Sequence, residues 1–197
     1  MTTTNVTRGH GMLEVWLSRQ RARRAEQLLP AELRDGRILD VGCGSFPYFL
    51  TNTQFKEKFA IDQLPASVPQ DEITWHVMDL NASPTLPFTD GFLSAVTLLA
   101  VAEHIHPDSL TAILREAHRT LRPGGRVALT TPAAWSDGLL KLMARLGLVS
   151  AEEIGEHVYG YTLPLLGWQF GRAGFDMARV RFGYFELGLN LWAMAER

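Results

Sequence analysis

The chain has 197 residues, of which 46% are hydrophobic and 20% charged, with a formal net charge of -2. This length and composition can bury a full core, so we expect residues 1–197 to form a single domain. The small net charge gives no overall field that would attract a polyanion, so no nucleic-acid partner is expected. Cys43 is the single cysteine, which excludes an intramolecular disulfide and a multi-cysteine zinc site and favours a reducing, cytoplasmic setting.

Two stretches decide the expectation about membranes. Residues 92–102 form the longest apolar run, which is too short to cross a bilayer. Residues 1–7 are polar and lack the apolar core of a signal peptide. We therefore expect no membrane span.

The first predicted element is an amphipathic helix over 12–29, which ends before Pro30. Its apolar positions include Leu13, Trp16 and Leu17. The intervening arginines, at 19, 21, 23 and 24, fit a solvated helix face better than a patch for an acidic partner.

A buried strand followed by a glycine turn comes next. Ile38, Leu39 and Val41 suit a strand that is covered on both faces. Gly42 and Gly44 then permit positive φ and leave no Cβ between the main chain and a ligand. Asp40, at the end of the strand, suits a ligand with an ammonium or hydroxyl groups better than one that presents only phosphates.

Acidic residues also end the next two predicted strands. Asp62 follows the strand at 59–61, eighteen positions after Gly44, a spacing at which a carboxylate can accept hydrogen bonds from ribose hydroxyls. An ordinary surface aspartate is the competing interpretation. Asp79 follows a strand at 73–78, and the apolar run 92–102 fits a central strand that ends at Glu103 and His104.

The second half of the chain completes the alternation of helices and strands. We expect a helix over 108–121 with Asp108 as its N-cap, then a strand over 126–131. The segment 133–170 is apolar and prone to form helices, either as a substrate-side lid or as a cover for one sheet face. Two strands, 176–184 and 187–195, form a terminal hairpin. The order predicts a doubly wound α/β fold.

Together these motifs resemble those of the class I S-adenosylmethionine (SAM) dependent methyltransferases, in particular the small single-domain enzymes of the methyltransferase type 11-like group. The resemblance covers 36–132 and rests on the segments 39–44, 87–92, 103–105 and 121–125. It implies a Rossmann-like methyltransferase fold: a mostly parallel seven-stranded sheet, helices on both faces and a C-terminal antiparallel hairpin. It also implies SAM as the cofactor.

The resemblance assigns roles residue by residue. Asp40 would hold the methionyl amino group, directly or through water, and the turn residues Gly42, Cys43 and Gly44 would lie against the cofactor. Asp62, followed by Gln63, matches the ribose-binding acid, and Asp79 with Leu80 matches the adenine site. Glu103 belongs to the common ending of the fourth strand and is placed with the cofactor-binding residues.

One departure and one rival fold follow from the glycine turn. Phe46 stands where the family frequently has a further glycine, and its ring is expected to reshape or close the methionine end of the site. A dinucleotide-binding turn that begins at Gly42 would need glycine where Pro47 stands, and Asp40 would face a pyrophosphate unfavourably.

Methyl transfer needs alignment of donor and acceptor and exclusion of water, with no metal. For a hydroxyl acceptor, His104 is the first candidate for a general base, against a purely structural role in the loop. His157 and Tyr161 are candidates for the substrate side. Seven residues suggest a hydrophobic or amphiphilic acceptor, although core packing explains most of them equally well: Trp135, Leu139, Leu140, Met143, Tyr159, Tyr161 and Trp168. The alternative is an inactive SAM-binding module, or an adaptor that binds a partner through 135–170.

Overall fold

The computed structural model describes residues 13–67, 71–150, 155 and 158–197. Seven strands form one sheet in the order β3-β2-β1-β4-β5-β7-β6. The first five strands pair in parallel, and β7 runs antiparallel to both β5 and β6. This arrangement confirms the predicted doubly wound α/β sheet with a C-terminal antiparallel hairpin.

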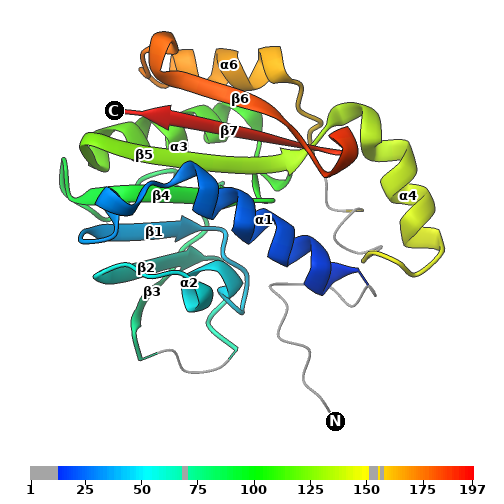
Figure 1. Ribbon diagram of the computed structural model, residues 1–197, viewed down its shortest axis with the longest axis horizontal. Helices are drawn as coiled ribbons and strands as arrows, with labels where there is room; N and C mark the ends of the chain where they lie inside the picture. Colours follow the sequence, from blue (N-terminus) through cyan, green and yellow to red (C-terminus); the bar gives the residue numbers. More distant parts are fainter. Residues whose placement is uncertain (1–12, 68–70, 151–154, 156–157) are drawn as a thin grey trace.

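The helices and strands are α1 (Glu14–Leu28), β1 (Arg37–Val41), α2 (Tyr48–Asn52), β2 (Glu57–Asp62), β3 (Ile73–Val77), β4 (Leu93–Leu99), α3 (Pro107–Thr120), β5 (Leu121–Pro132), α4 (Asp137–Arg145), α6 (Leu163–Arg172), β6 (Val180–Phe185) and β7 (Asn190–Glu196). Helices α1 and α2 lie on one face of the sheet, and α3 and α6 lie on the other (Figure 1). Helix α4 lies beyond the carboxyl ends of the parallel strands (Figure 1).

Strand β1 shows why the central strands read as continuous apolar runs. Ile38 packs into the cluster beneath α1 and α2, whereas its neighbour Leu39 packs into the larger cluster on the α3 and α6 face. Both side chains are fully buried. Since successive side chains of a strand point to opposite faces, a strand covered on both sides needs apolar residues at every position.

Several predicted boundaries were wrong. Strands β6 and β7 begin at Val180 and Asn190 rather than at 176 and 187, because short 3-10 turns precede them. Helix α3 has His106 as its N-cap and Pro107 at its first position, so Asp108 lies inside the first turn; proline suits that position because its missing N–H would be unpaired there in any case. Strand β4 ends at Leu99 because Ala100 has a φ of 54°. Strand β5 begins at Leu121, directly after α3.

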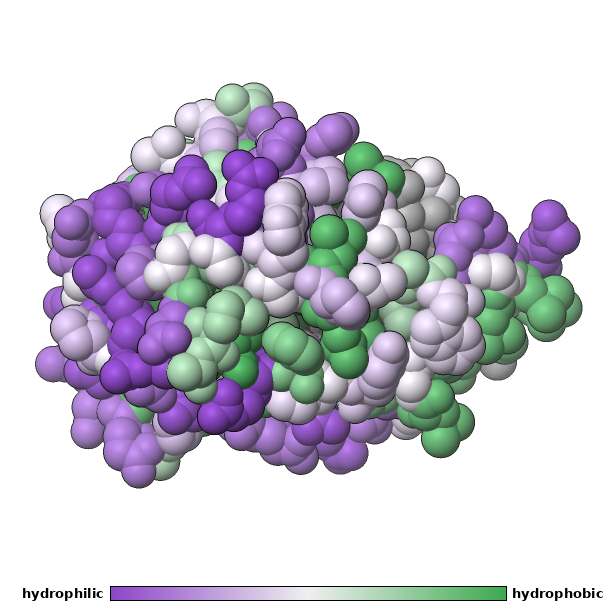
Figure 2. Space-filling model, turned by 90° about the horizontal axis from the view of Figure 1, so that it is seen from above, coloured by the Kyte–Doolittle hydropathy of each residue, from purple (hydrophilic) through white to green (hydrophobic). Residues whose placement is uncertain are grey.

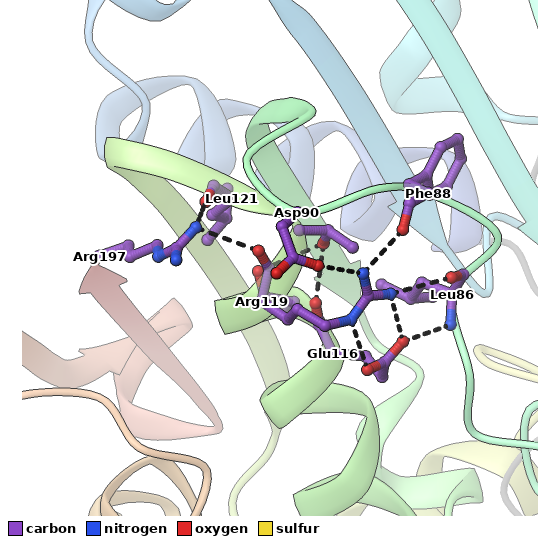
Figure 3. Close-up of polar contacts among 9 residues, drawn as sticks. Leu86, Phe88, Asp90, Glu116, Arg119, Leu121 and Arg197 are labelled. Atoms are coloured by element: carbon purple, nitrogen blue, oxygen red, sulfur yellow. Dashed lines mark hydrogen bonds and ion pairs between the residues drawn. The ribbon is translucent and has the colours of Figure 1, made fainter.

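The connection between β3 and β4 is fastened to α3 by Arg119 (Figure 3). The guanidinium donates to the carbonyl oxygens of Leu86 and Phe88 at 3.2 and 2.9 Å and pairs with Asp90 at 2.8 Å. It also donates to both carboxylate oxygens of Glu116, which in turn accepts the N–H of Leu86 at 3.0 Å. This network holds the connection between β3 and β4 in place. The first residues of that connection lie at the carboxyl ends of the parallel strands.

No helix in the described part of the chain is both long and apolar enough to cross a membrane.

Candidate functional site

A cavity of about 230 Å³ lies at the carboxyl ends of β1, β2, β3 and β4. This is the edge at which ligands bind in open α/β sheets. Its walls include seven of the residues predicted to bind the cofactor or to act in catalysis, namely Gly42, Gly44, Asp62, Gln63, Asp79, Leu80 and His104. The structure therefore brings together residues that lie far apart in the sequence.

The glycine turn has the geometry that its sequence predicts. Gly42 and Gly44 both have a φ of 69°, in the left-handed region that favours glycine. A Cβ on Gly42 would lie only 2.1 Å from Cγ2 of Val101. The turn therefore needs glycine for its backbone conformation and for the close approach of the segment after β4.

Asp62 is held rigidly beside this turn. Its side chain is buried, with Oδ2 accepting the N–H of Gly44 at 2.8 Å and Oδ1 accepting the N–H of Leu64 at 2.9 Å. Each carboxylate oxygen can accept a second hydrogen bond. An orientated carboxylate at this position fits a ligand that presents two neighbouring hydroxyl groups.

Asp79 and Leu80 form the adjoining wall. The carboxylate of Asp79 is exposed and accepts the N–H of Asn81 at 2.9 Å, whereas Leu80 is buried. The side chain of Asn81 lies 3.5 Å from the carbonyl oxygen of His104 and 3.4 Å from the N–H of His106. The segments that follow β3 and β4 are thus joined at the site.

Asp40 lies behind the glycine turn and is almost completely buried. Thr97 donates a hydrogen bond to its Oδ1 at 2.6 Å. Burial raises the pKa of the Asp40 carboxyl to about 7, and the nearby charge of Asp62 adds to the increase, while the bond from Thr97 opposes it. Asp40 lines a small cavity of about 30 Å³ together with Arg21 and Tyr48, which has room for a bridging water molecule.

The residues on either side of the second glycine contribute less directly. Cys43 is buried, with its Sγ 3.4 Å from the carbonyl oxygen of Gly44, and lines the small cavity beside Asp40. Phe46 is half-buried and is not among the residues that line the 230 Å³ cavity. Its ring therefore does not fill that cavity.

A second cavity, of about 170 Å³, lies between α1 and α4 and reaches the turn before β7. Its apolar lining includes Leu17, Leu140 and Met143. The start of α1 is tied to the segment after α4, because Leu13 donates its N–H to the carbonyl oxygen of Leu148 at 3.0 Å. Three residues, Arg21, Ala100 and His104, line both this cavity and the first one.

Of the predicted pair Glu103 and His104, only His104 lines both cavities. Glu103 is buried, accepts a hydrogen bond from Thr131 Oγ1 at 2.9 Å and lines the apolar cavity alone. Its main-chain oxygen accepts the N–H groups of Val158 and Tyr159. Glu103 is therefore not among the residues that line the 230 Å³ cavity.

The two residues assigned to the substrate side have different outcomes. Tyr161 is fully buried in the core on the α3 and α6 face, with its ring 5.5 Å from that of Tyr159. Burial raises the pKa of its phenol, and the charge of Glu103 adds to the effect. It lines neither cavity, since its aromatic ring is taken up in the packing. His157 lies outside the described residues.

Ser18 and Arg21 of α1 were missed as site residues. Both line the 230 Å³ cavity at the carboxyl ends of the strands, called the cofactor-side cavity below, and Arg21 is half-buried rather than part of a fully solvated face. Arg19 and Arg23 are exposed as expected. The available signal was the helical spacing, because Arg21 lies four residues after Leu17 and therefore falls on the apolar stripe.

In 13–67, 71–150, 155 and 158–197, no three histidine, cysteine or acidic side chains are grouped so that they could hold a metal ion.

The comparisons with known proteins agree with this geometry. The model of the methyltransferase domain family matches residues 13–180. A ubiquinone biosynthesis O-methyltransferase from Xanthomonas oryzae pv. oryzae is 35% identical over 124 residues, which cover 53% of this chain and 48% of that protein. The tRNA N(3)-cytidine methyltransferase METTL2 of Gallus gallus is 27% identical over 179 residues, which cover 80% of this chain and 48% of that protein. The chain thus spans about half the length of these curated relatives.

A solved structure supports the same fold. The S-adenosylmethionine dependent methyltransferase from Mesorhizobium loti superposes with a TM-score of 0.67 at 16% identity, covering 92% of this chain and 100% of that one. The chain belongs to the methyltransferase domain family, with the Rossmann-like fold of the SAM-dependent enzymes and SAM as its cofactor. The glycine turn, the orientated carboxylate of Asp62 and the cavity around them fit that cofactor.

Proposed function

We propose that the protein transfers the methyl group of SAM to a small, mainly apolar acceptor bound in the cavity between α1 and α4. The observation that carries this proposal is the meeting of two cavities of different character at Arg21, Ala100 and His104. The first cavity has the polar residues suited to a nucleoside, and the second has an apolar lining. A transferred group passes between donor and acceptor, so their sites must adjoin.

In this assignment the cofactor supplies the electrophilic methyl group. The chain binds the cofactor and the acceptor, orientates them and excludes water. Asp62 and Gln63 hold the ribose, and Asp79 with Leu80 holds the adenine. Asp40 holds the methionyl amino group through a water molecule in the small cavity beside it, because its carboxylate lies behind the turn. Gly42 and Gly44 let the main chain approach, with Cys43 as a compact spacer between them.

His104 is the residue we propose as the general base. It lines both cavities, so its imidazole lies where an acceptor hydroxyl would meet the methyl donor, and it can take the proton that the hydroxyl loses. The Xanthomonas relative is by name an O-methyltransferase, which agrees with a hydroxyl acceptor. We place Glu103 on the acceptor side.

The apolar lining and the net charge of -2 support a small-molecule acceptor over the tRNA of the Gallus relative. Helix α4 then forms a wall of the acceptor site, in agreement with a substrate-side role for 133–170. The remaining alternatives are an inactive SAM-binding module and an adaptor for a partner protein.

Calorimetry with SAM and with S-adenosylhomocysteine tests the proposal first, and absence of binding by both would exclude a methyltransferase. Transfer of a radiolabelled methyl group to a metabolite extract then separates an enzyme from an inactive module. We expect His104→Ala to lose at least about 100-fold in rate on a labelled hydroxyl acceptor, in line with the contribution of general bases. His106→Ala is the matched control, since His106 is exposed and lines neither cavity.

A further inference from the structure

The cavity between α1 and α4 has a carboxylate at its wall that the proposed reaction does not use. Glu186 begins the short turn that joins β6 to β7. It lines this cavity but not the cofactor-side cavity. The turn that carries it lies at the same end of the molecule as α4 (Figure 1). Figure 2 shows hydrophobic residues at this end, and the exposed leucines of this region include Leu142 and Leu187.

The backbone at Glu186 is strained. Glu186 and Leu187 have φ values of 51° and 57°, and neither is glycine. The left-handed conformation costs an L residue roughly 1–2 kcal/mol. Such strain persists only where surrounding structure imposes it, and it gathers at ligand sites. If the position served only to turn the chain, glycine or asparagine would adopt this conformation with less strain. A glutamate here therefore points to a use for its side chain.

The carboxylate of Glu186 is only half satisfied. Its Oε2 accepts a hydrogen bond from Asn190 Nδ2 at 2.5 Å, while its Oε1 is buried with no hydrogen-bond partner within the described part of the chain. Burial raises the pKa of the Glu186 carboxyl, and the charge of Arg21 and the bond from Asn190 oppose that increase. A carboxylate with a buried, unpaired oxygen is costly, and a ligand that donates a hydrogen bond to this carboxylate lowers the cost.

We infer that Glu186 is a specificity-determining residue of the acceptor site, and that the acceptor is an apolar molecule carrying a hydrogen-bond donor, a hydroxyl or an amino group, which binds the carboxylate of Glu186. This inference rests on the proposed function, since it assigns the apolar cavity to the acceptor. Leu17, Leu140 and Met143 contact the apolar body of the ligand. The positive charge of Arg21, which lines the same cavity, limits the cost of the carboxylate there.

Glu186 acts in recognition rather than in proton transfer. His104 lines both cavities and Glu186 lines only one, so the base and the recognition group are separate residues. Loss of Glu186 should therefore change which ligands bind, while leaving the cofactor site as it is.

Binding of three probes with one apolar body tests this role: para-hexylphenol, para-hexylaniline and their donorless counterpart para-hexylanisole. Affinities are measured by calorimetry with the full chain, with and without S-adenosylhomocysteine. We expect the phenol or the aniline to bind about tenfold tighter than the anisole, the range of one hydrogen bond to a charged group, and the comparison of the two arms distinguishes hydroxyl from amine. Glu186→Leu should abolish that preference and bind the anisole at least as tightly as the native protein does.

Glu186→Gln should give an intermediate preference, because it keeps a neutral acceptor, and Glu32→Gln, on the exposed turn before β1, should leave the preference unchanged. Undiminished binding of the anisole by the leucine variant cannot arise from misfolding, because misfolding would weaken the binding of all three ligands. The inference is overturned if the native protein binds none of the probes, binds all three equally, or if Glu186→Leu keeps the preference. Failure of the proposed function appears separately, as absence of cofactor binding or of methyl transfer.

Discussion

We predict that Asp40 makes cofactor binding depend on pH. The pKa of its carboxyl is raised to about 7, so the free protein holds this group largely protonated below that pH. If Asp40 receives the methionyl ammonium, the ionised form binds better, and affinity for S-adenosylhomocysteine should rise by up to about tenfold per pH unit between pH 5.5 and 7. Calorimetry across this range measures it. Asp40→Asn should bind more weakly at pH 8 and show a flat profile, and a variant that keeps the native slope would remove Asp40 from the site.

The same group affects the stability of the protein without ligand. Its pKa is raised from 3.8 in the unfolded chain to about 7 in the folded one, so its favourable contribution is present below pH 3.8 and lost as pH rises to 7. The free energy of unfolding should therefore fall by up to about 4 kcal/mol from this group across that window. Denaturant titrations of the native protein and of Asp40→Asn give the difference. An equal pH dependence for both proteins would contradict the assignment.

Alanine substitutions at Gly42 and Gly124 distinguish the energetic cost of a steric clash from that of backbone strain alone. In Gly42→Ala, the new Cβ meets Val101 at 2.1 Å and the residue must keep a φ of 69°. We expect a loss of about 2–4 kcal/mol in the free energy of unfolding, together with weaker cofactor binding. Gly124→Ala is the matched control, because Gly124 has a φ of 75° and no atom lies within 4 Å of the point that its Cβ would occupy. It should cost about 1 kcal/mol and leave binding intact.

At the scale of elements, the network of Arg119 positions the connection between β3 and β4. Arg119→Ala removes donors from two carbonyl oxygens and from Glu116. We expect a loss of about 2–3 kcal/mol in unfolding free energy, measured by denaturant titration. Hydrogen bonds from Arg119 hold the pKa of Glu116 below 4.5, so this stabilisation should be present above that pH and lost as pH falls. Asp90→Asn should cost under about 1 kcal/mol, since Asp90 is exposed.

The elements themselves were largely predictable, because each has a local signal. The apolar run that contains Ile38 and Leu39 indicated a strand covered on both faces, and the glycines at 42 and 44 marked the turn after it. The errors fell at boundaries, where the conformation of one residue decides where an element begins or ends. The positive φ of Ala100 ends β4, and Pro107 shifts the N-cap of α3 to His106. No periodic pattern in the sequence predicts either of these two boundaries.

At the scale of the whole molecule, one half of the site was predictable and the other was not. The carboxyl ends of parallel strands meet at one edge, so Asp62 and Asp79 could be grouped without a structure. The apolar cavity instead joins α1, α4 and the turn before β7, which come from opposite ends of the chain. Arg21 and Glu186 had no shared motif to connect them, and their meeting is a property of the packed fold.

The division of the site into two cavities leads to a prediction about the acceptor side alone. Met143 of α4 lines the apolar cavity, whereas Leu142, one position earlier, is exposed and lines neither cavity. Met143→Trp adds a bulky ring to the cavity and should reduce methyl transfer to labelled acceptors by at least about tenfold, the effect of losing one to two kcal/mol of binding. The affinity for S-adenosylhomocysteine should stay within about twofold of the native value, because Met143 is absent from the cofactor-side wall. Leu142→Trp should leave both quantities unchanged. Equal loss of cofactor affinity in Met143→Trp would show that the two cavities are not separate sites, and unchanged transfer would place the acceptor elsewhere.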